Sequence, residues 1–350
     1  MNRKKIVVLF GGCSTEYEVS LKSAYTIIEH INQDFYEIVP IGITKEGTWY
    51  LYGGVLDKII KNTWMDDKSC LPVMISPNKC DHGIFVLHPN HIEKFRIDAI
   101  FPVLHGKNGE DGTVQGLCEL AGVPIIGCDT LCSALCMDKY KAHLIVQSRG
   151  IEVPKSVILK ECLDEALLYK KIKYLNMPLF VKPVKSGSSF GITKVQQKEE
   201  LFQAVEVAFT HDNEVIIEEN IEGFEMGCAI LGNHKLIIGE TDEIELSQGF
   251  FDYTEKYTLK SSKIHMPARI PNDMAKRVKK TACTIYRALG CSGFARVDVF
   301  LKADGTIVFN EVNTIPGFTS HSRYPNMLKG IGMKFEEIIE QLIRTAVDNE

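Results

Sequence analysis

The stretch Gly293–Pro325, GFARVDVFLKADGTIVFNEVNTIPGFTSHSRYP, places polar side chains at regular positions within two apolar runs. Arg296 and Asp298 alternate with apolar residues, so both side chains leave the same face of a predicted strand. Asp304 and Gly305 then supply a hairpin turn signal. The stretch therefore predicts a β-hairpin that presents a cation and a carboxylate on one face.

The return strand, residues 306–313, carries Glu311 and Asn313 two positions apart, at the same end of the hairpin as Asp298. Three oxygen ligands of this kind suit Mg²⁺, which usually keeps several waters and is also bound by substrate phosphates. The opposite face is expected to be buried, and it carries Val297, Val299, Val308 and Val312. An exposed hairpin with paired surface charges is the alternative, but the loop 314–322, TIPGFTSHS, favours a site.

Length, charge and cysteine usage narrow the class of protein. At 350 residues the chain is long enough for two or three domains. The formal net charge of −5 gives no general field that attracts nucleic acid, and no apolar run approaches the roughly 20 residues of a membrane span. Eleven cysteines lack a paired framework, which predicts reduced thiols in the cytoplasm. We therefore expect a cytoplasmic protein with no nucleic-acid partner and no membrane insertion.

Cys128, Cys132 and Cys136 repeat at a spacing of four, which could align three thiols on one helix face. A structural metal site would require a fourth ligand, but no histidine or fourth cysteine accompanies these three in the sequence. The expected role is therefore that of buried small hydrophobic side chains, with metal ligation as the alternative.

Residues 1–128 are predicted to form an α/β domain with a parallel sheet flanked by helices. The first strand leads through a glycine pair into a helix just after Glu16, and a strand, glycine turn and helix start form a ligand-binding corner. A loop containing His105 and Glu110 follows the strand predicted over residues 99–104. Loops at strand ends carry ligands in such sheets, so this loop is a second candidate wall of a site.

Residues 129–222 are predicted to form a second unit. Its buried strand over residues 178–183 has Lys182 next to its last residue, and the turn 185–191, KSGSSFG, begins two residues after the strand. The backbone donors and hydroxyls of such a turn could cover a polyphosphate, with Lys139 and Lys182 supplying positive charge. An ordinary hairpin turn is the alternative.

Residues 223–350 are predicted to form the third unit, which includes the hairpin and helices over residues 272–289 and 336–346. The segment 247–263, SQGFFDYTEKYTLKSSK, mixes aromatic and charged residues without an amphipathic period. That composition is typical of a lid that contacts a ligand and still opens. A solvent-facing insertion is the alternative.

Six motifs occur together and in order along the chain. They are GGxSxExEVS at 11–20, HGxxGEDGxxQG at 105–116, MDK at 137–139, VKPxxxGSSxG at 181–191, FDYxxKY at 251–257, and RxDxF with NExNTxPGFTxxS in the hairpin stretch. Over nearly its whole length the chain resembles the D-alanine:D-alanine ligases of the ATP-grasp superfamily. The resemblance implies a three-domain α/β and α+β fold with ATP held between two antiparallel sheets, and a homodimer.

The resemblance also implies a reaction, in which the carboxylate of a first D-alanine is phosphorylated and the amine of a second amino acid attacks the acyl phosphate. It assigns catalytic roles to Glu16, Ser188, Tyr257, Arg296 and the backbone amide of Gly317. It assigns ATP binding to Lys139, Lys182, Ser189, Glu218, Glu219, Ile221, Glu225 and Lys256, although Glu219 replaces a lysine that is frequent there. It assigns two Mg²⁺ ions, which Mn²⁺ can replace, to Asp298, Glu311 and Asn313. It places His105 and Glu110 in a substrate loop, and the second substrate at Phe251, Lys256, Ser322 and Arg323.

Two departures from the family pattern concern the second substrate. Arg323 follows Ser322 where most members have leucine or methionine, and the lid has Phe251 where many have tyrosine. A guanidinium in that pocket would offer donors to a substrate hydroxyl. Both departures resemble the vancomycin-resistance D-alanine:D-serine ligases of the VanC and VanG types, and the lid histidine of the D-lactate-adding relatives is absent.

We therefore expect an enzyme that joins D-alanine to D-serine for peptidoglycan precursors and so confers vancomycin resistance. One alternative is a housekeeping D-alanine:D-alanine ligase in which Arg323 makes a salt bridge outside the pocket. Another is a nucleotide-binding regulator that keeps the fold without turnover, against which the intact Glu16, Arg296 and Asp298 argue.

Overall fold

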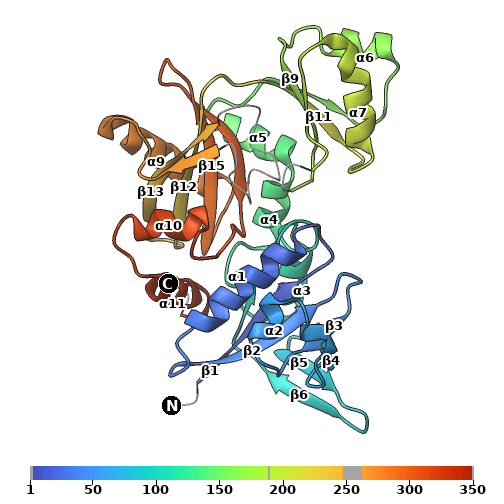
Figure 1. Cartoon of the computed structure of the whole chain (residues 1–350), viewed down its shortest axis with the longest axis vertical. Helices are drawn as coiled ribbons and strands as arrows, with labels where there is room; N and C mark the ends of the chain where they lie inside the picture. The colour runs from blue at the N-terminus through green and yellow to red at the C-terminus, as the bar shows by residue number, and fades with distance from the viewer. Residues whose placement is uncertain (1–2, 188–189, 247–261, 349–350) are drawn as a thin grey trace.

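The computed structural model describes residues 3–187, 190–246 and 262–348, and it arranges them around three sheets (Figure 1). In these ranges no helix is both long and apolar enough to cross a membrane. Five predicted site residues lie outside the described residues, and their roles stay predictions: Ser188, Ser189, Phe251, Lys256 and Tyr257.

The N-terminal sheet has seven strands in the order β6-β5-β4-β3-β2-β1-β7. They are β1 (Lys4–Gly11), β2 (Tyr36–Ile43), β3 (Trp49–Leu51), β4 (Leu71–Ile75), β5 (Gly83–Leu87), β6 (Ile92–Arg96) and β7 (Ala99–Pro102). β1 pairs in parallel with β2 and β7, as predicted. The sheet as a whole is mixed, because the short loops after β2, β4 and β5 allow only antiparallel neighbours.

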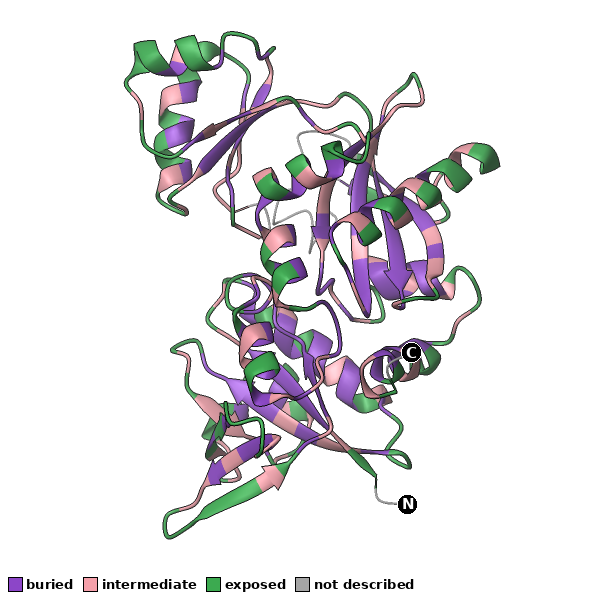
Figure 2. Ribbon diagram, turned by 180° about the vertical axis from the view of Figure 1, so that it is seen from behind, coloured by how far each residue is buried: buried purple, intermediate pink, exposed green. Residues whose placement is uncertain are grey.

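Helices cover both faces of this sheet, and they are α1 (Tyr17–His30), α2 (Asp57–Ile60), a 3-10 helix (Trp64–Asp66) and α3 (Thr113–Ala121). β1 is buried on both faces: Ile6 and Val8 pack in the core beneath α1, whereas Val7 and Leu9 pack in the core on the other side. A continuous apolar run is the signature of such a doubly covered strand. Figure 2 shows the contrast with β6, whose residues are mostly exposed.

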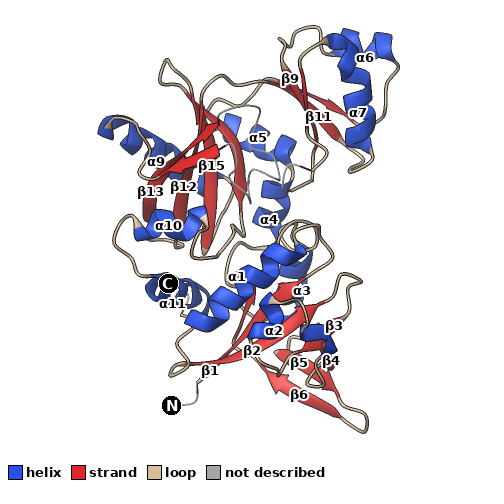
Figure 3. Ribbon diagram, viewed as in Figure 1, coloured by secondary structure: helices blue, strands red, loops and turns tan. Residues whose placement is uncertain are grey.

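The central sheet has the antiparallel order β10-β9-β11-β8. Its strands are β8 (Ser156–Leu159), β9 (Leu179–Pro183), β10 (Thr193–Val195) and β11 (Val215–Glu219). α6 (Glu165–Lys171) and α7 (Leu201–Phe209) pack on one face, and a 3-10 helix (Lys198–Glu200) precedes α7. α4 (Thr130–Met137) and α5 (Lys139–Gln147) connect this unit to the N-terminal domain (Figure 3).

The C-terminal sheet has the antiparallel order β14-β13-β12-β15-β16. Its strands are β12 (Phe224–Leu231), β13 (Ile237–Leu246), β14 (Ser262–His265), β15 (Phe294–Leu301) and β16 (Ile307–Asn313). α9 (Asn272–Ala288) packs on one face, and α10 (Arg323–Lys329) contacts β12 and β13. α11 (Phe335–Val347) leaves this unit and packs against α1 and β7, so the last helix completes the N-terminal core.

The predicted hairpin forms as β15 and β16, with Arg296 opposite Asn313 and Asp298 opposite Glu311. A register shift follows at once, because the next pair joins Val299 to Phe309. Phe309 therefore shares the core face with the three predicted valines Val297, Val299 and Val312. The prediction that Val308 lies on this face is wrong: it pairs with Phe300 on the other face, because the bulge inserts one extra residue into the alternation.

Candidate active site

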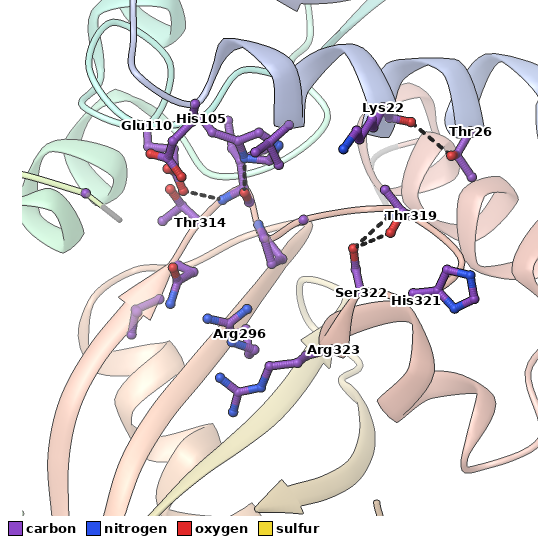
Figure 4. Close-up of a pocket in the computed structure, with 18 of the residues that line it drawn as sticks. Lys22, Thr26, His105, Glu110, Arg296, Thr314, Thr319, His321, Ser322 and Arg323 are labelled. Carbon is purple, nitrogen blue, oxygen red and sulfur yellow. Dashed lines mark hydrogen bonds between the residues drawn. The ribbon is translucent and has the colours of Figure 1, made fainter. Parts of the chain in front are cut away.

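A cavity of about 670 Å³ lies where α1 and the loop after β7 meet the C-terminal sheet (Figure 4). Its other walls come from the start of α5, the ends of β15 and β16, and the loop 314–322. The predicted site residues that line it are Glu16, His105, Glu110, Lys139, Arg296, Glu311, Asn313, Gly317, Ser322 and Arg323. Residues from all three predicted units therefore meet at one cavity.

The charged face of the hairpin is buried. The Asp298 side chain is 1% exposed, and Arg296 donates to it from Nε (2.8 Å to Oδ1) and Nη2 (2.7 Å to Oδ2). Asn313 Nδ2 also donates to Asp298 Oδ2, at 2.9 Å. A solvent-facing pair of surface charges is thereby excluded for this hairpin.

The oxygen atoms of Asp298, Glu311 and Asn313 form a donor set that fits Mg²⁺. Asp298 and Glu311 face each other across the hairpin, and Glu311 lines the cavity with Asn313. Arg296 offsets the buried charge of Asp298 through its paired hydrogen bonds.

Glu16 occupies the N-cap position of α1 and is 8% exposed. Its carboxylate lies close to Gly106 in the loop after β7. Gly106 leaves the room for it, because a Cβ at this position would lie 2.8 Å from Glu16 Oε2, and its φ of +71° also favours glycine. A largely buried carboxylate at the edge of the cavity is suited to receive an ammonium group.

His105 and Glu110 hold the backbone of the loop that follows β16. His105 Nδ1 donates to Ile315 O at 2.9 Å, and Glu110 Oε1 accepts from Ile315 N at 3.1 Å. Glu110 Oε2 accepts from Gly106 N at 2.8 Å. Burial, together with the nearby charge of Glu16, raises the pKa of Glu110 to about 8. Both residues thus position the loop that contains the Gly317 amide.

A second anchor of this loop comes from α1. Ser23 is fully buried, and its Oγ accepts a hydrogen bond from Phe318 N at 3.2 Å. The same oxygen lies 3.4 Å from His105 Nε2. With Nδ1 of His105 donating to a carbonyl, Nε2 is the acceptor, so the Ser23 hydroxyl links both partners.

The lysines assigned to phosphate lie at the junction with the central sheet. Lys139 Nζ donates to Ser186 O at 2.7 Å, which ties the start of α5 to the glycine-serine turn. Lys182 Nζ contacts Glu218 Oε2 at 2.6 Å across neighbouring strands, and both side chains are largely buried. Lys182 and Glu218 do not line the cavity described above.

Glu218 and His143 leave two buried acceptors next to each other. Burial lowers the pKa of His143, and its Nε2 lies 3.0 Å from Asn310 O, so the neutral ring carries its proton on Nε2. Its Nδ1 lies 3.6 Å from Glu218 Oε1, and neither atom has a hydrogen-bond partner within the part of the chain that the structure describes. A donor group such as the amine of an adenine ring would satisfy both, so these residues fit ATP.

Three further residues assigned to ATP binding, Glu219, Ile221 and Glu225, lie outside the cavity. Glu219 Oε1 accepts two hydrogen bonds from Asn176, both at 2.9 Å, and so holds its own neighbouring loop. Ile221 is half-buried just after β11. Glu225 Oε1 lies 3.8 Å from Arg323 Nη1. Their assignment to ATP stays a prediction.

Arg323 is the first residue of α10, and its side chain is 7% exposed. It makes a two-pronged ion pair with Asp242 of β13, from Nε to Oδ2 and from Nη2 to Oδ1, both at 2.7 Å. Nη2 also lies 3.7 Å from Asp298 Oδ1. Arg323 lines the cavity next to Ser322, whereas its partner Asp242 is not among the lining residues. Ser322 Oγ accepts a hydrogen bond from Thr319 N at 2.9 Å.

Sequence reasoning missed Asp242, His143 and Ser23. His143 follows Lys139 by one helical turn, a spacing that could have flagged it. Asp242 and Ser23 give no local signal, because their partners Arg323 and Phe318 are far away in the sequence.

Comparisons with known proteins agree with this geometry. Residues 5–128 match the model described as D-ala D-ala ligase N-terminus, and residues 145–344 match D-ala D-ala ligase C-terminus. Vancomycin B-type resistance protein VanB of Enterococcus faecalis is 47% identical, with 99% of this chain and 100% of that protein covered. A putative D-alanine–D-lactate ligase of Streptomyces coelicolor is 44% identical, with 99% of each covered.

A solved structure, the VanG D-Ala:D-Ser ligase from Enterococcus faecalis, superposes with a TM-score of 0.91. It is 60% identical, and the match covers 98% of this chain and 99% of that one. The two family models together span most of the chain, and the solved structure extends the likeness to the whole fold. The chain belongs to the D-alanine–D-alanine ligase family and has its ATP-grasp fold.

Proposed function

We propose that this ligase joins D-alanine to D-serine with ATP, forming a D-alanyl phosphate on the way. The observation that carries the proposal is Arg323, a guanidinium held by Asp242 in the cavity wall beside Ser322. Support comes from the 60% identity with a structure described as a D-Ala:D-Ser ligase. The D-alanine–D-lactate relative is less similar, at 44% identity.

The first half of the reaction takes place at the end of the cavity near Glu16. In this proposal the Glu16 carboxylate binds the ammonium group of the first D-alanine. This contact points the carboxylate of the D-alanine toward the hairpin. Lys139 and Lys182 position the phosphates of ATP, whose terminal phosphorus accepts the D-alanine carboxylate oxygen while ADP leaves. Asp298, Glu311 and Asn313 would hold Mg²⁺, which would supply positive charge to offset the charge of the phosphates.

The second half forms the peptide bond. The amine nitrogen of the second amino acid attacks the acyl carbon, the bond from that carbon to the phosphate oxygen breaks, and the proton that the nitrogen loses passes to the departing phosphate. Arg296 and the amide of Gly317 donate to the oxyanion that forms, and one such donor can lower a barrier by about 3 kcal/mol. His105 and Glu110 act indirectly, because they fix the loop in which this amide lies.

Selection of D-serine follows from how Arg323 is held. Asp242 takes Nε and Nη2, whereas Nη1 lies 3.8 Å from Glu225, beyond ordinary hydrogen-bond distance. Nη1 therefore keeps donor capacity for a hydroxyl oxygen, directly or through water. A methyl side chain would leave that donor unpaired, which costs binding free energy.

A housekeeping D-alanine:D-alanine ligase is the second candidate, and the same ion pair favours it in part, since Asp242 already uses two donors of Arg323. Steady-state kinetics with D-serine and D-alanine as competing second substrates separates the two. The proposal requires a higher kcat/KM for D-serine, and a higher kcat/KM for D-alanine would establish the housekeeping function.

The cellular setting proposed for this activity is cytoplasmic synthesis of peptidoglycan precursors that end in D-serine, which would confer vancomycin resistance. Relatives include proteins described as vancomycin resistance proteins. We propose a homodimer as the working form, and light scattering of the purified enzyme would test it.

A further inference from the structure

Four cysteine side chains converge between α4 and the start of β15. Cys128 precedes α4, Cys132 and Cys136 lie in its first and last turns, and Cys291 lies in the turn between α9 and β15. All four are buried free thiols, as the sequence predicts for the first three. The fourth cysteine, Cys291, lies more than 150 residues further along the chain, so the spacing of the first three does not indicate it.

The sulfur positions have the geometry of a ligand set. The sulfurs of Cys128, Cys132 and Cys291 all lie within 4.8 Å of one another. The sulfurs of Cys132 and Cys136 are 3.8 Å apart. A tetrahedral zinc ion with Zn–S bonds of about 2.3 Å separates neighbouring sulfurs by about 3.8 Å, so the Cys132–Cys136 edge already matches. The edges among Cys128, Cys132 and Cys291 need a contraction of about 1 Å at most. Cys136 lies outside that group of three and must move closer to its other members to complete the ligand set.

From this convergence we propose that Cys128, Cys132 and Cys291, with Cys136 as fourth ligand, bind one thiophilic metal ion of the Zn²⁺ class. Each coordinating thiol releases its proton to solvent as its sulfur bonds to the metal, so no oxidant or reductant takes part. Metal entry has a route, because Cys136 also lines the active-site cavity. The oxygen donors Asp298, Glu311 and Asn313 suit a different, harder cation.

The site would have a structural consequence for the enzyme. α4 lies at the junction of the N-terminal domain with the other two units (Figure 1). Cys291 lies just before β15, the strand that carries Arg296 and Asp298. A metal ion here would tie the junction helix to the catalytic hairpin, and binding to the folded state alone would stabilise that state.

Cadmium titration of the reduced, metal-free enzyme tests the site, with thiolate-to-cadmium charge-transfer absorption as the readout. This absorption reports sulfur coordination and is silent for cadmium at the oxygen ligands. We expect saturation at one Cd²⁺ per chain, competition by Zn²⁺, and at least a tenfold loss of affinity in Cys291→Ala. The matched control is Cys228→Ala, which removes another thiol buried in the same apolar cluster but outside the metal group.

Cys132→Ser provides a second variant in case Cys291→Ala does not fold, and it should lose affinity to a similar degree. An absent charge-transfer band in the wild-type enzyme, or equal bands in Cys228→Ala and the cluster variants, would overturn the proposal. Peptide mapping without reductant gives an independent check, because a disulfide between Cys128 and Cys291 in the purified enzyme would assign the cluster to thiol oxidation instead.

Discussion

Arg323 and Asp242 are the residue pair on which second-substrate selection depends in our proposal. Replacing Arg323→Met removes the donors and restores an apolar residue common in the family. We expect the ratio of kcat/KM for D-serine to that for D-alanine to fall by about 10- to 100-fold, since unpaired polar groups cost about 1–3 kcal/mol. Kinetics with each second amino acid measures this ratio.

The thermal stability of the Arg323→Met variant must be measured as a control, because the substitution also breaks the ion pair with Asp242. Asp242 is 1% exposed, and removal of its partner leaves a buried charge, which destabilises proteins by about 3–5 kcal/mol. The double variant Arg323→Met with Asp242→Asn should recover part of the lost thermal stability while keeping the altered ratio. A Met variant with an unchanged preference would mean that Arg323 has only a structural role.

Glu110 should make stability depend on pH near neutrality. Its pKa rises from 4.5 to about 8 in the folded protein, so between these values the folded state holds a proton that the unfolded state has lost. The contribution of Glu110 to stability is therefore fully present below pH 4.5 and is lost as the pH rises toward about 8. The Glu110→Gln variant has no titratable group at this position. Its melting temperature should therefore fall less steeply than that of the wild-type protein between about pH 5 and 8. Parallel curves for the two proteins would contradict this.

At the scale of elements, α1 secures the loop that follows β16. Ser23→Ala leaves the Phe318 amide without its acceptor, and an unpaired buried donor costs about 1–3 kcal/mol. Thr26→Ala is the matched control. The Thr26 hydroxyl lies in the same helix but donates only to the backbone oxygen of Lys22, at an exposed position. Thermal melts should show a clear loss for Ser23→Ala and little change for Thr26→Ala. Equal losses would mean that α1 does not anchor the loop.

The hairpin illustrates what could be predicted at this scale. Alternation and the Asp-Gly turn predicted β15, β16 and the meeting of Asp298 with Glu311. The bulge before Val299 was not predictable, because an extra residue in one strand leaves no compositional signal. α10 was also missed, although the Pro325 that it contains is compatible with a helix, because proline is tolerated in the first turn and Pro325 lies there.

For the whole molecule, α11 shows that the C-terminus completes the N-terminal core. Leu342 is fully buried in the cluster beneath α1, so Leu342→Ala should destabilise the protein by about 2–5 kcal/mol. Glu336→Ala, on the exposed side of the same helix, should stay within about 0.5 kcal/mol. Denaturant unfolding followed by the fluorescence of Trp64, which is buried in this cluster, measures the difference. A Leu342→Ala variant with an unchanged free energy of unfolding would contradict this packing.

The motifs along the chain predicted the fold and ten of the residues that line the cavity, because each motif lies within a short segment. The pairing of Arg323 with Asp242 and the approach of Cys291 to Cys132 could not be read in this way. Both join segments far apart in sequence, and their contacts depend on how sheets and helices pack. In our proposal the identity of the product depends on such a contact, which is why it needs a direct measurement.

That measurement is product analysis from one reaction containing the enzyme, ATP, Mg²⁺ and equal concentrations of D-alanine and D-serine. Mass spectrometry of the dipeptides reports both the reaction and the choice of second substrate. The proposed function predicts D-alanyl-D-serine as the main product, with D-alanyl-D-alanine in the minority. A mixture dominated by D-alanyl-D-alanine would contradict it and identify a housekeeping ligase.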